Sequence, residues 1–292
     1  MAAEDRDRVV RIATWNLWWR FGGWEQRLDA IAAVMAEVDA DIWTLQEVWA
    51  GPDGSPNQAE LLAGPLGMRW DWAPYGGLEF WQRRAEPDST DALIGTAVLS
   101  RWPLGLAVHD VLPTVDDVPG RGPIHVVSVA HPSGPVSVVT THLSSAWARS
   151  DLRQLQLGAV VDVLGRADDE ARLTVVTGDF NAPPVAEEIR RLAGWAPAYE
   201  PGTGLIDAWE YLRPDDRGAT WVRRNPHVQR HREPDLRIDY LFLAPPFPEG
   251  VGEPLRVEVI GDAPVEGVWP SDHFGVVADL RIRPAPSSSG AD

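Results

Sequence analysis

Short apolar runs of strand length, most of which end in a polar residue, constrain the fold of this chain more than any other feature. The first run, VVRIATWNL at residues 9–17, is rich in β-branched residues and reaches Asn16 near its end. Such residues favour strands, and a run of this length suits a buried strand. Further strands are predicted at residues 39–48, 94–100, 124–130, 135–142, 173–180, 237–243 and 274–282.

Segments with helical periodicity lie between these strands. Residues 24–38 place apolar side chains on one face, residues 145–167 form the clearest amphipathic pattern, and residues 186–193 predict a shorter helix. Because strands and helices mix without a strict order, the pattern favours an α/β fold with two packed mixed β-sheets and helices outside. We see no internal repeat or long linker, so residues 1–283 are predicted as one domain and residues 284–292 as a disordered tail.

The composition excludes some kinds of site and weighs against one mode of binding. The chain has no cysteine, so disulfides and thiolate metal sites are excluded, and any metal must be held by oxygen or imidazole. The net charge is −17, which opposes loose, sequence-blind binding to nucleic acid. There is no apolar leader at the start and no apolar run long enough to span a bilayer. We therefore expect a cytoplasmic protein, with secretion after removal of a signal peptide as the alternative, and we expect it to be a monomer.

Six apolar runs end in groups that bind cations, transfer protons or donate hydrogen bonds. One polar strand end is ordinary, because a strand often stops where the core stops. Six are harder to dismiss, and two sheets packed face to face would bring them to one rim. The groups are Asn16 in TWN, Glu47 in LQE, His142 in TTH, Asp179 and Asn181 in TGDFN, Asp239 in RID, and Asp272 and His273 in SDH.

These residue types suit the hydrolysis of a phosphate ester. Mg²⁺ prefers hard oxygen ligands and keeps several waters, so Glu47 and Asp272 are candidate ligands. Asp179 is the candidate base for the attacking water. The two asparagines and two histidines of the set can donate to phosphoryl oxygens that gain charge in the transition state. Asp239 can hold His273 in one tautomer and keep it protonated.

The same motifs carry a resemblance to a known family. In this order, TWN, LQE, GTAVLSR, TTHL, TGDFN, RIDYLFL and SDHFGV resemble the endonuclease/exonuclease/phosphatase superfamily over about residues 9–282. The superfamily includes pancreatic-type deoxyribonucleases, abasic-site endonucleases, bacterial neutral sphingomyelinases and inositol-polyphosphate phosphatases. The resemblance implies a four-layer α/β/β/α sandwich and a hydrolase that depends on a divalent cation, usually Mg²⁺, with Mn²⁺ as the alternative.

The resemblance also implies a metal-binding set. By motif, Glu47 matches the principal metal ligand, and Asn16 matches a ligand or phosphate contact beside it. Asp272 matches a second ligand of the metal or of water. One departure concerns the position two residues after Asn16, where abasic-site endonucleases usually carry aspartate and this chain has Trp18.

A catalytic set follows from the same motifs. Asp179 matches the residue that orients or activates the water, and Asn181 matches its partner on the phosphate. Asp239 and His273 match the dyad that stabilises the transition state. His142 stands where deoxyribonuclease- and sphingomyelinase-like members have a histidine. Deoxyribonuclease-like members pair this histidine with a glutamate. In this sequence Glu79 and Asp91 are possible partners, and no motif decides between them.

Two further features concern substrate binding. Residues 211–240 hold seven arginines and five acids, so they form either a loop that attracts phosphate or a solvated charged loop, and Arg224 and Arg237 are the candidate contacts. Trp18 and Trp19 follow the strand that carries the site asparagine. They either line the mouth of the pocket or pack in the core.

The resulting hypothesis is a Mg²⁺-dependent phosphodiesterase with nuclease-like activity, whose first candidate substrate is nucleic acid. A sphingomyelinase-like lipid phosphodiesterase and a phosphatase of small soluble esters are the alternatives. A catalytically silent binding module with the same fold is the remote alternative. Because every motif position keeps a residue that can act, the sequence favours an enzyme.

Overall fold

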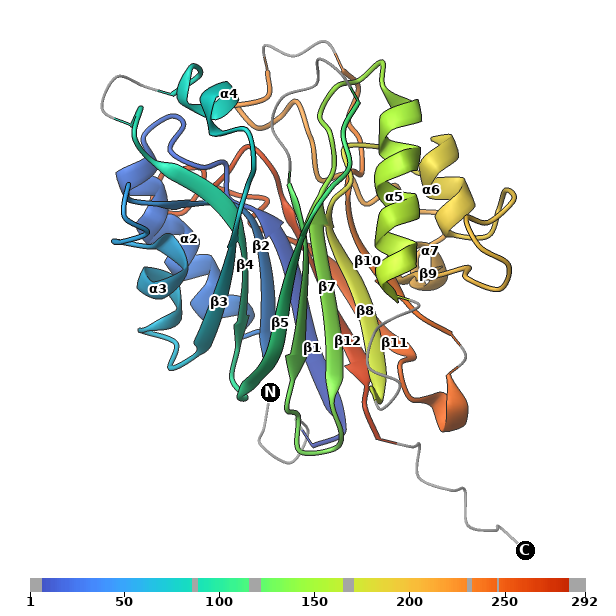
Figure 1. Cartoon of the computed structure of the whole chain (residues 1–292). Coiled ribbons are helices and arrows are strands. Elements are labelled where there is room, and N and C mark those ends of the chain that lie inside the picture. Colours follow the sequence, from blue (N-terminus) through green and yellow to red (C-terminus); the bar gives the residue numbers. More distant parts are fainter. Residues whose placement is uncertain are drawn as a thin grey trace, which may run out of the picture.

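Two six-stranded mixed sheets pack face to face with helices on both outer sides, as the computed structural model in Figure 1 shows. The structure describes residues 7–85, 89–115, 122–164, 171–229, 233–245 and 247–283. This arrangement confirms the four-layer α/β/β/α sandwich. The predicted tail, residues 284–292, lies outside the described residues.

The first sheet combines strands from the start and the end of the chain, and the second sheet contains the strands that lie between them in the sequence. The first sheet has the spatial order β11 (Pro254–Ile260), β12 (Gly275–Arg281), β1 (Val9–Asn16), β2 (Ile42–Ala50), β4 (Leu93–Ser100) and β3 (Arg69–Pro74). The second sheet has the order β5 (Leu104–Val111), β6 (Pro123–Val129), β7 (Val136–His142), β8 (Leu173–Asp179), β10 (Asp239–Leu243) and β9 (Ile206–Asp207).

The helices cover the outer faces of the sheets (Figure 1). On the first sheet lie α2 (Trp24–Val38) and α3 (Gln58–Ala63), and on the second lie α5 (Ser150–Leu164) and α6 (Glu187–Leu192). The remaining short helices are α4 (Leu78–Gln82), α7 (Ala208–Leu212) and a 3₁₀ turn at Pro248–Gly250.

Three apolar clusters follow from this layering. Inward side chains of both sheets, such as Ile12 and Val175, form the central core. The outward side chains of the first sheet, such as Trp43, pack against α2 and α3, and those of the second sheet, such as Val176, pack against α5 and α6. Because strand side chains alternate between faces, a strand buried on both sides must be apolar throughout, as the runs in the sequence are.

The strand directions bring polar strand ends to one rim. β1 runs parallel to β2, and β7 runs parallel to β8, so the carboxyl ends of each pair lie at the same edge of its sheet. β12 and β10 are antiparallel to β1 and β8, so their first residues lie at that edge too. A hydrogen bond from Asn16 to Asp179 joins the two edges, so the rim is shared by both sheets.

The structure differs from the sequence-based elements at identifiable points. The strand predicted from residue 39 begins at Ile42, because Asp39 takes a left-handed conformation (φ 52°) that caps α2. The helix predicted from residue 145 begins at Ser150. β5 and β11 have no counterpart in the prediction, since both lie at sheet edges where many side chains are exposed and the apolar signal is weak.

Candidate active site

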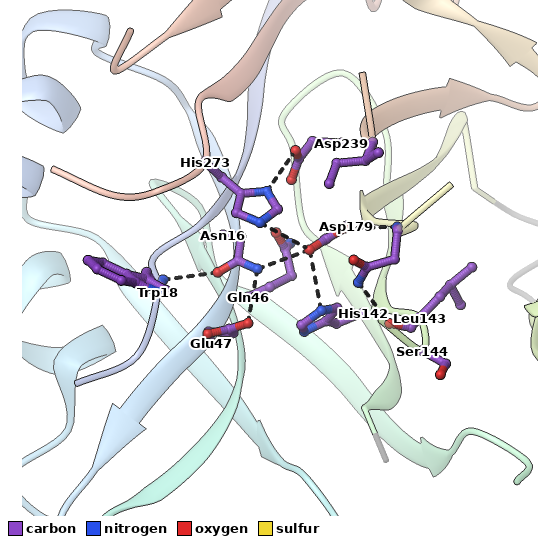
Figure 2. A network of polar contacts seen from close by, with 12 residues as sticks. Asn16, Trp18, Gln46, Glu47, His142, Leu143, Ser144, Asp179, Asp239 and His273 are labelled. Carbon is purple, nitrogen blue, oxygen red and sulfur yellow. Dashed lines mark hydrogen bonds and ion pairs between the residues drawn. The ribbon is translucent and has the colours of Figure 1, made fainter. Parts of the chain in front are cut away.

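Six side chains from both sheets meet at the shared rim (Figure 2). They come from the end of β1, the middle of β2, the ends of β7 and β8, the start of β10 and the segment before β12. All six are buried, and they are Asn16, Glu47, His142, Asp179, Asp239 and His273. The structure therefore brings together most of the candidate residues that the sequence singled out.

A β-bulge directs Glu47 into the site. The pairing of β2 with β4 shifts register between Leu45 and Val48, and Glu47 lies in this interval with a φ of 53°. A left-handed backbone at a residue other than glycine is costly and is found where the surroundings enforce it. The bulge thus re-aims the Glu47 side chain, whose Oε1 accepts a hydrogen bond from Asn16 Nδ2 at 3.3 Å.

Asp179 lies at the centre of the site. Its Oδ2 is 3.0 Å from Asn16 Nδ2, 3.3 Å from His142 Nε2 and 3.7 Å from His273 Nε2. Its Oδ1 accepts a hydrogen bond from the backbone N–H of Asn181 at 2.8 Å. Burial, opposed by the charge of His273, raises the pKa of Asp179 to about 7.

The glycine that precedes Asp179 is required by close packing of two strands. Gly178 has a φ of 137°, and a Cβ placed on it would lie 2.0 Å from the carbonyl oxygen of Thr141. No other residue fits there without moving β7 away from β8. Asn181 then turns back with a φ of 48°, and its Nδ2 donates to the carbonyl of Leu143 at 3.0 Å.

His273 is a charged donor held by a carboxylate. Its Nδ1 donates to Asp239 Oδ2 at 3.0 Å. Burial opposes the charged imidazolium, but the Asp239 and Asp179 carboxylates outweigh it and raise the pKa of His273 well above the ordinary value. His273 is therefore protonated at neutral pH, with Nε2–H directed towards Asp179.

His142 is a neutral donor held by a phenol. Tyr75 accepts a hydrogen bond from the backbone N–H of Glu47 at 3.4 Å, and its own hydroxyl lies 2.8 Å from His142 Nδ1. Burial lowers the pKa of His142 to about 4, and burial together with the Glu47 charge keeps the pKa of Tyr75 well above 10. The hydroxyl therefore donates to Nδ1, which leaves the proton of the neutral ring on Nε2.

Tyr75 answers a question that the motifs left open. The sequence offered Glu79 and Asp91 as partners of His142, and the structure places the Tyr75 hydroxyl there instead. Trp81 packs nearby, with ring centroids 5.9 Å from Tyr75 and 6.4 Å from His142. Sequence reasoning missed Tyr75, because no motif surrounds it and its strand ends one residue earlier.

The donor set fits a hard divalent cation. Glu47 Oε2 and Asp239 Oδ1 are buried oxygen atoms that accept no hydrogen bond from the described residues. Burial raises the pKa of Glu47, against the opposing charge of His142, and burial raises the pKa of Asp272 to about 6. A buried carboxylate oxygen that accepts no hydrogen bond is unfavourable unless a positive charge lies beside it. A bound divalent cation would supply that charge.

A second group of possible metal ligands lies within the same site. Asp179, Asp239 and His273 each place one ligand atom within 4.8 Å of the others. Asp272 lies next to this group, and its Oδ1 is 3.4 Å from the hydroxyl of Ser271. The same hydroxyl donates to the backbone carbonyl of Asn16 at 2.7 Å, which ties the SDH segment to the end of β1.

A buried arginine on α2 supports the loop after β1. The Arg27 guanidinium donates to the carbonyl oxygens of Leu17, Trp18, Trp19, Phe21 and Pro270 at 2.8–3.1 Å. Burial lowers its pKa to about 10, although the carboxylates of Asp272 and Glu47 oppose this shift. Sequence reasoning missed Arg27, because a single arginine on a helix is ordinarily solvated.

The two tryptophans after β1 have different positions. Trp18 is half-buried, with its ring 4.4 Å from the His227 ring and 4.8 Å from the Arg27 guanidinium. Trp19 is fully buried against Trp81, and its Nε1 donates to the carbonyl of Leu93. Of the two alternatives left open for Trp19, the pocket mouth or the core, its buried ring fits the core.

The two candidate arginines also separate. Arg237 is buried, and its Nη1 lies 2.5 Å from Asp207 Oδ2. This ion pair engages one nitrogen of the guanidinium, and the role of Arg237 as a substrate contact stays a prediction. Arg224 is exposed and pairs with Asp262 at 2.7 Å, above the ring of Phe274. Its role as a substrate contact stays a prediction.

None of the described helices combines the length and apolar character that a bilayer span requires.

Comparison with known proteins gives a family and several structural relatives. The family model described as Endonuclease/Exonuclease/phosphatase family matches residues 13–273. The chain is similar to the inositol phosphosphingolipids phospholipase C of Schizosaccharomyces pombe, with 23% identity over 315 residues. That alignment covers 96% of this chain and 70% of the relative.

Solved structures share the fold over nearly the whole chain. An endonuclease/exonuclease/phosphatase from Beutenbergia cavernae is 25% identical with a TM-score of 0.69, covering 96% of this chain and 73% of that chain. D. rerio TDP2 complexed with single-strand DNA product is 19% identical with a TM-score of 0.71, covering 93% and 98%. The human Nocturnin catalytic domain with bound sulfate anion is 20% identical with a TM-score of 0.65, covering 94% of each chain.

Proposed function

Because this chain belongs to the endonuclease/exonuclease/phosphatase family, whose members hydrolyse phosphate esters, we propose that it is a Mg²⁺-dependent phosphodiesterase with nuclease-like activity. One observation carries the proposal. Asp179 Oδ2 lies 3.0 Å from an amide nitrogen of Asn16 and within 3.3–3.7 Å of Nε2 of His142 and of His273. A buried carboxylate among donors can hold a water beside an anionic phosphate.

The metal belongs to the Glu47 side of the site. In this proposal Glu47, Asn16 and Asp272 hold Mg²⁺, with Mn²⁺ as the alternative. The cation supplies Lewis-acid polarisation of the phosphate and neutralises its charge. The unpaired Oε2 of Glu47 supports the assignment, because a buried carboxylate oxygen without a hydrogen bond is otherwise unfavourable.

Asp179 is the proposed base. Its pKa of about 7, raised by burial, means that the carboxylate can accept a proton at neutral pH and return it afterwards. Asn181 fixes Oδ1 through its backbone N–H, so Oδ2 is the oxygen that faces the water. The Asn181 side chain is the proposed contact to the phosphate.

The two histidines are proposed as donors with different charges. His273, protonated and held by Asp239, can neutralise the oxyanion that develops on the phosphate. His142, neutral and held by Tyr75, can donate Nε2–H without adding a charge. Preorganised donors of this kind stabilise the transition state more than the ground state, because charge on the phosphate grows during the reaction.

Two classes of phosphodiester are the candidate substrates. Nucleic acid is the first candidate, and the likeness to a TDP2 structure that holds a single-strand DNA product supports it. A phospholipid headgroup ester is the second, and the similarity to the Schizosaccharomyces pombe phospholipase C over 96% of this chain favours it specifically. The charge of −17 weighs against a long polyanion and thereby supports the second candidate. The cytoplasmic location and the monomeric state stay predictions.

A parallel activity panel tests the proposal. Purified protein with Mg²⁺ or Mn²⁺ is assayed on bis-p-nitrophenyl phosphate, p-nitrophenyl phosphate, single-stranded DNA, RNA and sphingolipid vesicles. We expect hydrolysis of the diester and of one polymeric or lipid substrate. Asp179→Asn should lose at least 100-fold in kcat, whereas the exposed Asp151→Asn should behave as the unmodified protein. Failure on every substrate would reject the proposal.

A further inference from the structure

A second cluster of metal-ligand side chains lies where the edges of the two sheets meet. Asp71 is on β3, and His109 and His125 are paired across β5 and β6. Both Nε2 atoms point at the same carboxylate oxygen, with His109 Nε2 2.7 Å and His125 Nε2 2.8 Å from Asp71 Oδ1. One ligand atom from each residue lies within 4.8 Å of the others. None of the three is part of the network in Figure 2.

We propose that Asp71, His109 and His125 form a binding site for Zn²⁺ that connects the edge strands of the two sheets. Two imidazole nitrogens and one carboxylate oxygen are a donor set that suits Zn²⁺, with water in the fourth position. The distances require only a small adjustment. Ligand atoms about 2.0–2.1 Å from a tetrahedral ion lie about 3.3 Å apart, so each nitrogen needs to move about 0.5 Å from Asp71.

Thr96 completes the surroundings that a metal-binding histidine needs. Its Oγ1 lies 3.1 Å from Nδ1 of His125, and it is fully buried on β4. When Nε2 of His125 binds an ion, its proton must lie on Nδ1 and needs an acceptor. A hydroxyl can either donate to Nδ1 or accept from it, so Thr96 satisfies the ring with and without the ion.

The site is accessible and its ligands are ready to bind. Asp71 and His109 are 31% and 36% exposed, whereas His125 is 0% exposed, so an ion can enter from the His109 side. Burial lowers the pKa of His125 despite its hydrogen bond to Asp71, and the same hydrogen bond, donated by His125, lowers the pKa of Asp71. A neutral imidazole and an ionised carboxylate are the forms that bind a metal.

The position of the cluster gives it a structural consequence. β3 and β5 are the terminal strands of their sheets, and no hydrogen-bonded ladder connects them. An ion held by Asp71 on one side and by the two histidines on the other would link these edges. It would also steady β3, which leads directly into Tyr75 at the rim.

Zinc stoichiometry tests the proposal. The intact chain, Asp71→Asn, His109→Gln and Asp110→Asn are each equilibrated with Zn²⁺, and bound metal is counted after removal of free ion. Asp110 is the matched control, because it follows His109 and its side chain points to the other face of β5. We expect the intact chain and Asp110→Asn to bind one equivalent more than Asp71→Asn and His109→Gln. Equal stoichiometry in all four proteins would overturn the proposal.

A second readout separates this cluster from the candidate active site. Zn²⁺ titration is followed by ¹⁵N NMR of the imidazole nitrogens, with His109→Gln identifying one set of signals. We expect the Nε2 signals of both His109 and His125 to shift, and Thr96→Val to weaken binding about 10- to 100-fold. Unmoved His109 and His125 signals at saturating Zn²⁺ would overturn the proposal and leave the cluster as a hydrogen-bonded group without a metal.

Discussion

At the scale of single residues, the candidate site depends on how each polar group is held. His142 shows this most clearly, because a phenol occupies the place for which the sequence offered a carboxylate. A carboxylate would favour the imidazolium, whereas the Tyr75 hydroxyl sets the tautomer and adds no charge. Asp179 thus lies between two histidines, of which His273 is charged and His142 is neutral.

Removing the Tyr75 hydroxyl should impair catalysis more than folding. Tyr75→Phe leaves Nδ1 of the buried His142 without its donor, which costs about 1–3 kcal/mol. In kcat this corresponds to roughly a 5- to 150-fold loss on bis-p-nitrophenyl phosphate. The exposed Tyr211→Phe is the control. An unchanged kcat, or an unchanged His142 tautomer in ¹⁵N NMR spectra, would contradict the assigned role.

The neighbouring tryptophans should respond in opposite ways to substitution by alanine. Trp19→Ala removes a fully buried indole and should lower the free energy of unfolding by about 3–5 kcal/mol. Trp18→Ala should cost less stability and should raise KM for the natural substrate class more than for bis-p-nitrophenyl phosphate. Denaturant melts and steady-state kinetics on both variants measure this. Similar stability losses for the two would show that Trp18 is also a core residue.

At the scale of elements, the site is shaped by irregularities in otherwise regular strands. The bulge in β2 gives Glu47 its left-handed backbone, and the loop after β1 places Trp18 and Trp19 at positive φ. Arg27 on α2 holds that loop through four backbone carbonyls and also donates to the carbonyl of Pro270. A helix side chain thereby determines the shape of the rim.

Arg27 should be intolerant of replacement. Arg27→Met leaves buried carbonyl oxygens without donors and should lower the free energy of unfolding by about 3 kcal/mol or more. Arg27→Lys should not restore it, because an ammonium group cannot reach several divergent carbonyls at once. Chemical denaturation reads this out, with the exposed Arg190→Met as a control. A loss below about 1 kcal/mol for both Arg27 variants would refute this account of the loop.

The regular elements could be predicted from the sequence, and the irregular ones could not. Periodicity alone defines α2 and locates β1 and β8 to within a residue, because burial on one or both faces dictates their apolar pattern. The edge strands β5 and β11 carry a weaker pattern. Tyr75 and Arg27 reach the site through contacts between distant segments, which single-sequence reasoning does not contain. For the same reason the sequence could not decide between the core and the pocket mouth for Trp19.

At the scale of the whole molecule, two sheets contribute halves of one site. The first sheet supplies Asn16 and Glu47, and the second supplies His142, Asp179 and Asp239. Neither half contains both the proposed metal ligand and the proposed base. The packing of the sheets therefore assembles the site. The proposed zinc site, which links β3 and β5, would stabilise this same packing.

We propose that this assembled rim binds a divalent cation through Glu47 and hydrolyses a phosphodiester. Hydrolysis of bis-p-nitrophenyl phosphate, measured after treatment with a chelator and then with added Mg²⁺, tests it most directly. We expect no turnover without the cation, full recovery with it, and at least a 100-fold loss for Glu47→Gln, whereas Glu79→Gln, at an exposed position, should leave turnover unchanged. Chelator-resistant hydrolysis would show that the reaction needs no cation, and equal Mg²⁺ dependence in Glu47→Gln and the intact chain would show that Glu47 does not bind it.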